Sequence, residues 1–363
     1  MISPARQIAF DVLRRVHLGG YASDLLLQRS AQLDSRDAGL ASEIVFGCLR
    51  YQAQLDYLIA RRVPRPPDPE VQIALRMGIY QLRYLDRIPA HAAVGESVEL
   101  VKRIHKASAA GLVNAILRKT DRQPVPWPDR ATDLSMPPWL LERWDGKFGR
   151  ATATKIAAAF LQPAETHVAS TGRIQDIGAQ SIVPFLDLHP GQTFLDLCAA
   201  PGNKTAQAIE RGARTVACDI HLHRLKQMRD LNCSLVVLDG TRPLPFRGKF
   251  DRILVDAPCS GTGTLGRNPE IKWRLQPADL IDLHAKQVAL VRQALEHLCP
   301  GGRLVYSTCS LEAEENEQVI QEIPGPWQVS ERLPGLNAGD GFFVAVCNSP
   351  GPLPYGHGSE PRA

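Results

Sequence analysis

Five short apolar segments between residues 194 and 306 restrict the fold of this chain more than any other feature. Each has the length and composition of a buried strand, and helical patterns such as residues 280–298 separate them. Such alternation predicts a mainly parallel sheet with helices on both faces. We therefore predict a doubly wound α/β domain over residues 191–350, with a late strand at 342–346. The five segments are residues 194–196, 215–219, 235–239, 252–256 and 303–306, and four of them end in Asp.

The first third of the chain has a different pattern. Apolar residues recur at helical spacing from residue 5 to about residue 122, and the strand pattern is absent there. This predicts an all-α domain of six or so helices over residues 1–125. Prolines then mark a linker and abbreviated subdomain over residues 126–190, with an amphipathic helix at 139–148 and a helix opening at 174–180.

The distribution of charge and the spacing of the cysteines limit the classes of protein to which this chain can belong. Residues 1–122 contain 18 Lys and Arg against 12 Asp and Glu, although the whole chain carries only +4. A polyanion partner for this part is one interpretation, and a solvated helical surface is the other. No apolar run is long enough for a membrane helix, and the eight cysteines form no C-x-x-C pair. We expect a cytoplasmic protein with free thiols, no metal and no membrane contact.

Two thiols follow predicted strands at the sheet edge where open α/β folds place their active sites. Cys259 lies in the stretch 256–263, which begins with Asp256, and Cys309 follows the strand 303–306. Taken one at a time, each would more often be an inert buried thiol. Together with the carboxylate, they indicate covalent catalysis by a thiolate.

Residues 196–205 predict a tight turn between a strand and a helix. Small residues there allow close approach to a ligand, but the glycine spacing of a nucleoside triphosphate loop is missing. Asp219 and Asp239 end the next two strands. A single aspartate at such a place is usually a helix cap. Three aspartates at consecutive strand ends favour a nucleoside-like ligand, with Asp219 on the ribose and Asp239 near the adenine.

Residues 196–205, 256–263, 306–310 and 314–317 together resemble the NOL/NOP/Sun family of RNA cytosine-5 methyltransferases. Residues 36–47, 88–100 and 111–118 resemble the RNA-binding fold of the antitermination factor NusB, where Asn114 and Arg118 would share a surface. The resemblance implies a Rossmann-like methyltransferase domain that uses S-adenosyl-L-methionine. It also implies Cys309 as the nucleophile and Cys259 as the residue that assists product release. The implied cofactor contacts are Cys198, Ala199, Ala200, Pro201, Gly202, Asn203, Lys204, Asp219, Asp239 and Asp256.

The chemistry fits these roles. Thiolate addition at C6 makes cytosine C5 nucleophilic. Asp256 near N3 would hold or donate a proton, and Lys204 would lower the pKa of a nearby thiol. The target base must be unpaired or flipped out. Basic and aromatic side chains after the thiol loop suit RNA contacts, although a solvated loop is the alternative. These side chains are Arg267, Asn268, Lys272, Trp273 and Arg274.

Two departures from the family pattern affect the details. Asn203 replaces a glycine, and residues 151–190 are shorter than the usual RNA-binding subdomain. We predict a monomeric enzyme that methylates cytosine C5 in RNA, most simply small-subunit ribosomal RNA. The alternatives are the same reaction on tRNA, or a non-catalytic RNA-binding factor for ribosome assembly.

Overall fold

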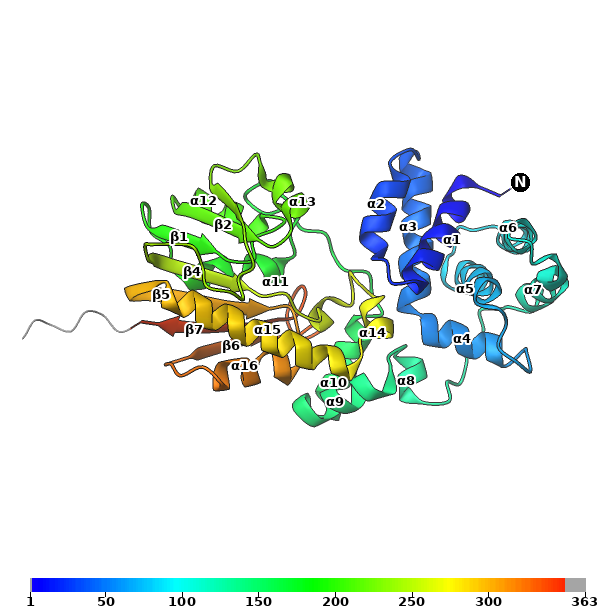
Figure 1. The fold of residues 1–363 in the computed structure, drawn as a ribbon. Coiled ribbons are helices and arrows are strands. Elements are labelled where there is room, and N and C mark those ends of the chain that lie inside the picture. The colour runs from blue at the N-terminus through cyan, green and yellow to red at the C-terminus, as the bar shows by residue number, and fades with distance from the viewer. Residues whose placement is uncertain (1, 350–363) are drawn as a thin grey trace, which may run out of the picture. The chain divides into compact units, whose positions relative to one another are not determined.

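The computed structural model describes residues 2–349, which form two compact units (Figure 1). The helical unit comprises Met1–Ala164 together with Thr264–Leu275. The sheet unit comprises Glu165–Gly263 and the chain from Gln276 onward. The segment predicted as a linker, 126–190, is therefore divided between the two units. The tail after residue 350, which the sequence suggests is loose, lies outside the described residues.

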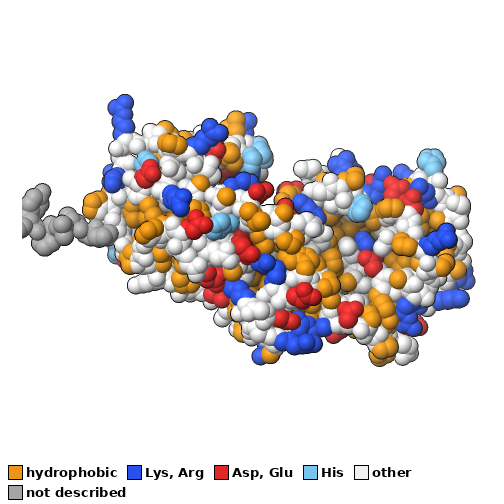
Figure 2. Space-filling model, turned by 60° about the horizontal axis from the view of Figure 1, so that its bottom comes forward, with side chains coloured by type: hydrophobic (Ala, Val, Ile, Leu, Met, Phe, Trp, Pro, Cys, Tyr) orange, Lys and Arg blue, Asp and Glu red, His pale blue; other side chains and the backbone are white. Residues whose placement is uncertain are grey.

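The helical unit is all α, as predicted. Helices α1 and α5 begin with a proline in their first turn, and the side chains of Asp34 and Asp68 cap α3 and α5. One apolar core joins the first seven helices, around Phe10, Ile44 and Leu75. On the face drawn in Figure 2, Lys and Arg side chains gather in several clusters over this unit, with Asp and Glu among them. The helices are α1 (Pro4–His17), α2 (Ala22–Ser30), α3 (Ser35–Arg50), α4 (Gln52–Ala60), α5 (Pro69–Tyr84), α6 (Ala90–Arg103), α7 (Ala110–Arg118), α8 (Arg130–Asp133), α9 (Pro138–Phe148), α10 (Arg150–Ala159) and α14 (Ile271–Arg274).

The sheet unit contains a seven-stranded sheet in the order β3-β2-β1-β4-β5-β7-β6. The first five strands are parallel, and β7 pairs antiparallel with both β5 and β6. This confirms the predicted doubly wound fold. The sequence did not reveal β6, because its five residues, QVSER, lack the apolar run of a buried strand. The strands are β1 (Thr193–Asp196), β2 (Arg214–Asp219), β3 (Ser234–Val237), β4 (Phe250–Asp256), β5 (Leu298–Thr308), β6 (Gln328–Arg332) and β7 (Phe342–Asn348).

Apolar clusters cover both faces of the sheet. Helix α15 (Pro277–Glu296) packs Val291 on one face, against Ile253 of β4 and its neighbours. On the other face, Leu254 packs with Ala208 of α12 (Asn203–Glu210). Successive residues of β4 therefore point to opposite layers, as the two-residue period of a strand requires. The smaller helices of this unit are α11 (Ile177–Gln180), α13 (Leu222–Leu225) and α16 (Glu317–Gln321).

Within residues 2–349, we find no helix that combines the length and the apolar character needed to span a membrane.

Candidate active site

Two neighbouring parallel strands bring the predicted thiols together. Asp256, the last residue of β4, pairs with Ser307 near the end of β5. The loops that follow therefore leave the sheet side by side. Cys259 Sγ and Cys309 Sγ lie 3.3 Å apart, and both thiols are partly accessible. The contact with Cys309, reinforced by burial, raises the pKa of Cys259 well above its usual value. Cys259 is thus held as the protonated thiol.

A buried carboxylate holds the two thiol loops in place. Glu315 has no solvent exposure, and it accepts a hydrogen bond of 2.8 Å from the backbone N–H of Ser260, the residue after Cys259. It also accepts hydrogen bonds from the hydroxyl groups of Ser260 and of Ser310, the residue after Cys309. Gln287 of α15 donates a further bond of 3.0 Å. One side chain thus links the residues that follow both thiols.

Lys204 and Asp256 form an ion pair beside the thiols. Lys204 Nζ donates to Asp256 Oδ2 at 2.6 Å, and Ser307 Oγ donates to Asp256 Oδ1 at 2.7 Å. Burial alone would lower the pKa of Lys204, but the charge and hydrogen bond of Asp256 outweigh it, so the pKa is raised. Lys204 is therefore a stable ammonium. Both oxygens of Asp256 accept a hydrogen bond here, one from Lys204 and one from Ser307.

A pocket of about 550 Å³ opens at this edge of the sheet. Seven residues predicted to form the site line it: Cys198, Ala200, Asp219, Asp239, Asp256, Cys259 and Cys309. The other five predicted residues, Ala199, Pro201, Gly202, Asn203 and Lys204, belong to the same turn and helix start but are not among its lining residues. Asn203 points elsewhere, because its side-chain amide donates to the carbonyl of Ile174 at 3.1 Å.

The two aspartates after β2 and β3 occupy different environments. Asp219 is buried, and its oxygens accept from the N–H groups of Ala200 and His221 at 3.3 and 2.8 Å. Asp239 is more exposed and accepts from the N–H and hydroxyl of Thr241, which lowers its pKa. Both keep acceptor capacity toward the pocket, since each carboxylate oxygen can accept more than one hydrogen bond.

Asp196 lies beneath the pocket rather than in its wall. It is fully buried, accepts one bond of 2.7 Å from Thr205 Oγ1, and its Oδ1 has no partner among the described residues. Burial raises the pKa of Asp196 from 3.8 to about 7, and the Thr205 bond opposes only part of this shift. The structure therefore places Asp196 as a buried acid that supports the turn.

This burial predicts a pH effect on stability. Between pH 3.8 and about 7, folded Asp196 keeps a proton that the unfolded chain releases. Stability contributed by the protonated group is complete at low pH and is lost as the pH rises through this window. Because of Asp196, the unfolding free energy of the wild type should fall by roughly 2–4 kcal/mol as the pH rises through this window. Asp196→Asn should abolish this part of the fall. Urea unfolding at several pH values measures this.

The exposed Asp282 provides the control for that measurement. Asp282→Asn is expected to follow the wild-type pH dependence. If the Asp196→Asn curve also runs parallel to the wild-type curve, the buried acid does not have the raised pKa assigned to it.

Several residues of the site were not found from the sequence. Ile220 is 55% exposed although it is a large apolar residue, and it lines the pocket next to Asp219. His221, Arg224 and Lys286 also line it, and the last comes from α15. Ile220 and His221 could have been expected in the site, because they directly follow an aspartate that ends a predicted strand. No sequence pattern indicated Lys286, because its position at the pocket depends on how α15 packs on the sheet.

The prediction that Lys272 and Trp273 contact RNA is not supported. Lys272 is 1% exposed and donates to the carbonyl of Arg50 at 2.9 Å, and Trp273 Nε1 donates to the carbonyl of Leu49 at 2.7 Å. Burial lowers the pKa of Lys272 to about 7. Arg274 likewise donates to the carbonyl of Gly20 at 3.0 Å. This segment is packed into the helical unit, because its polar groups satisfy the carbonyls at the end of α3 and before α2.

The fold is a doubly wound α/β domain with a pocket at the carboxyl ends of its parallel strands. The crystal structure of the protein PH0851 aligns with 95% of this chain and 99% of its own length, with a TM-score of 0.77 and 20% identity. A methyltransferase homologue from Pyrococcus horikoshii aligns with 62% of this chain and all of its own, with a TM-score of 0.52 and 24% identity. At these identities the likeness shows the fold alone.

Sequence comparison identifies the family. The model described as 16S rRNA methyltransferase RsmB/F matches residues 183–331, and the NusB family model matches residues 3–122. Ribosomal RNA small subunit methyltransferase B from Thermus thermophilus is 34% identical, over 93% of this chain and 93% of its own length. The Klebsiella pneumoniae protein of the same name is 31% identical, over 94% of this chain and 97% of its own. The chain belongs to the RsmB/F family of RNA methyltransferases and carries an N-terminal NusB domain.

The Klebsiella alignment extends over 420 positions, more than the 363 residues of this chain. That relative therefore contains segments that this chain lacks.

Proposed function

We propose that the chain methylates C5 of a cytosine in small-subunit ribosomal RNA, using S-adenosyl-L-methionine and a covalent adduct between Cys309 and C6. The observation that carries the proposal is the 3.3 Å contact between Cys259 and Cys309 at the wall of a pocket that Asp219, Asp239 and Asp256 also line. Family membership supports the ribosomal RNA substrate, because the curated relatives carry the name ribosomal RNA small subunit methyltransferase B.

The pocket fits the methyl donor. Its volume of about 550 Å³ lies in the range of small-molecule sites. Asp219 and Asp239 offer acceptors for hydroxyl and amino groups, while Ile220, Leu238 and Leu290 offer apolar wall. We assign the nucleoside part of the donor to these residues. When bound, the donor supplies an electrophilic methyl group on a sulfonium.

The two thiols divide the work between them. Cys309 attacks C6 as a thiolate, and the electron pair of the C5–C6 double bond makes C5 nucleophilic. Cys259, whose pKa is raised by its contact with Cys309 and by burial, stays a thiol during this step. After methyl transfer Cys259, once its own proton has passed to solvent, takes the C5 proton; the electron pair of the broken C5–H bond re-forms the C5–C6 double bond, and the C6–S bond breaks to return the Cys309 thiolate. Cys259 lies within 3.3 Å of that sulfur and assists this release.

Lys204, positioned by Asp256, supplies a proton to the ring nitrogen of the base. The ammonium group of Lys204 lies beside the thiols. It is held there by its hydrogen bond to Asp256, in which Nζ and Oδ2 are 2.6 Å apart. As negative charge develops on the base during thiolate addition, this proton can stabilise it. Ser307, through its 2.7 Å bond, keeps Asp256 oriented toward the pair.

Bisulfite sequencing of total RNA tests the proposal. A strain that lacks this chain is expected to lose one methylated cytosine in small-subunit ribosomal RNA, and the wild-type chain is expected to restore it. Loss of a tRNA position instead would move the same chemistry to tRNA. Loss of no position would favour a non-catalytic role in ribosome assembly.

A further inference from the structure

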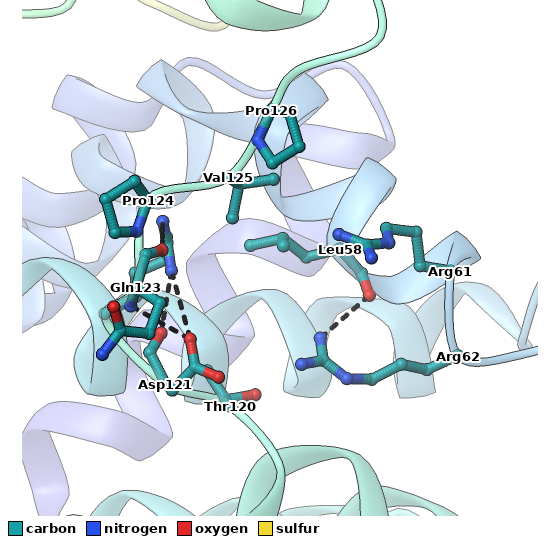
Figure 3. A pocket seen from close by; sticks show the side chains of 10 residues that line it. Leu58, Arg61, Arg62, Thr120, Asp121, Gln123, Pro124, Val125 and Pro126 are labelled. Carbon is teal, nitrogen blue, oxygen red and sulfur yellow. Dashed lines mark hydrogen bonds and ion pairs between the residues drawn. The ribbon is translucent and has the colours of Figure 1, made fainter.

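A second pocket, of about 350 Å³, lies wholly within the helical unit. It is formed by the C-terminal end of α4, by Arg83 of α5 and by the stretch after α7, residues 120–126. Figure 3 shows the hollow between Arg61 and Arg62 on one side and Asp121 to Pro124 on the other. The methyltransferase chemistry proposed above does not use it.

The pocket carries positive charge. Three arginines and one aspartate line it. Arg62 donates to the carbonyls of Leu58 and Lys119 at 3.2 and 2.9 Å, and Arg83 donates to those of Asp121 and Gln123 at 2.8 and 2.7 Å. These carbonyls fix both guanidinium groups without neutralising them. The Asp121 carboxylate is 65% exposed and 3.9 Å from Arg83, so it offsets little of the charge.

Arg61 is the exposed member of the set. Its guanidinium lies over the ring of Tyr57 at 5.8 Å, and that ring contacts Trp127 with centroids 5.9 Å apart. The stacking holds the side chain at the rim of the pocket and leaves its N–H donors available to a ligand. An anion that entered would therefore meet a guanidinium in a prepared position.

The part of the pocket between these two polar sides is apolar. Leu58 and Val125 lie between the two polar sides in Figure 3, next to Pro124 and Pro126. An inorganic anion would gain nothing from such a wall. A nucleotide would gain from both parts, because its phosphate pairs with guanidinium groups and its base packs on a flat apolar surface.

We propose that this pocket binds one nucleotide of the single-stranded part of the RNA substrate, with the phosphate at Arg61 and Arg62 and the base against Val125 and the prolines on either side of it. The inference rests on the proposed function for the identity of the RNA. It gives the NusB domain a defined contact that is separate from the methylation site.

Charge removal at Arg61 tests the pocket in the full chain. We expect Arg61→Ala to weaken binding of the unmethylated ribosomal RNA about five- to tenfold and to reduce the salt slope by about 0.7, as loss of one contact to single-stranded RNA predicts. Arg61→Glu is expected to weaken it further. The methylation rate at saturating RNA should stay unchanged while KM rises, because Arg61 belongs to the helical unit and the thiols belong to the sheet unit.

Arg15, exposed on α1, supplies the matched control. Arg15→Ala and Arg15→Glu are expected to retain the wild-type affinity and salt slope. Wild-type affinity in both Arg61 variants would overturn the nucleotide pocket, even if the chain methylates RNA normally; an acidic protein surface would then be the better ligand for these arginines. Wild-type RNA binding without any methylation would instead count against the proposed function alone.

Discussion

Cys259→Ala is expected to leave the protein covalently attached to its RNA substrate, whereas Cys309→Ala is expected to form no attachment and to lose methylation by roughly 10³-fold or more. The reason is the division of roles between two sulfur atoms that lie 3.3 Å apart. Without Cys309 the bond to C6 cannot form. Without Cys259 the bond forms, but its release slows.

Denaturing gels with labelled RNA measure the adduct, and transfer of a labelled methyl group measures turnover. Cys299→Ala serves as the control, because Cys299 is a partly accessible free thiol at the opposite, N-terminal end of β5. It should behave as the wild type does in both assays. A stable adduct in Cys309→Ala, with none in Cys259→Ala, would show that the two roles are reversed.

The sequence located the thiols but did not show how they meet. Strand ends could be predicted because β1, β2 and β4 are apolar runs that finish in Asp. The meeting of the loops depends on β4 and β5 being neighbours in the sheet, in the register that pairs Asp256 with Ser307. Strand order is set by packing among distant segments, so a local pattern carries no information about it.

Buried polar contacts were the other part that could not be predicted. Lys272 is a lysine after a catalytic loop, which suggests an RNA contact, yet its ammonium is satisfied by the carbonyl of Arg50, 222 residues away. Glu315 was visible only as part of a family motif. The groups that donate hydrogen bonds to it come from three separate segments, and only the folded chain brings Ser260, Ser310 and Gln287 to the same carboxylate.

Substitution of Glu315 is therefore expected to affect both the stability of the protein and its turnover. Glu315→Ala would remove, in a buried site, the acceptor of the Ser260 N–H and of two serine hydroxyl groups, while the Gln287 amide would keep only its bond to the carbonyl of Pro258. Unsatisfied buried donors cost about 1–3 kcal/mol each before relaxation, so we expect a loss of roughly 3–5 kcal/mol in unfolding free energy. The thiol loops would also shift, and a misplacement near 1 Å reduces turnover by about 10²-fold.

Glu315→Gln tests whether the acceptor oxygens of Glu315 are sufficient to hold the two thiol loops in place. It keeps one acceptor oxygen, and the serine hydroxyls can rotate to accept from its amide, so most of the stability should return. The oxygen of the glutamine can take the place of Oε1, which accepts from the Ser260 N–H and from Gln287, so the loop after Cys259 should keep its position and turnover should recover together with stability. Glu322→Ala, which removes a carboxylate that is 51% exposed, should match the wild type in both measurements. If Glu315→Gln recovered stability but not turnover, the negative charge of Glu315, and not only its acceptor oxygens, would be required at the thiol loops.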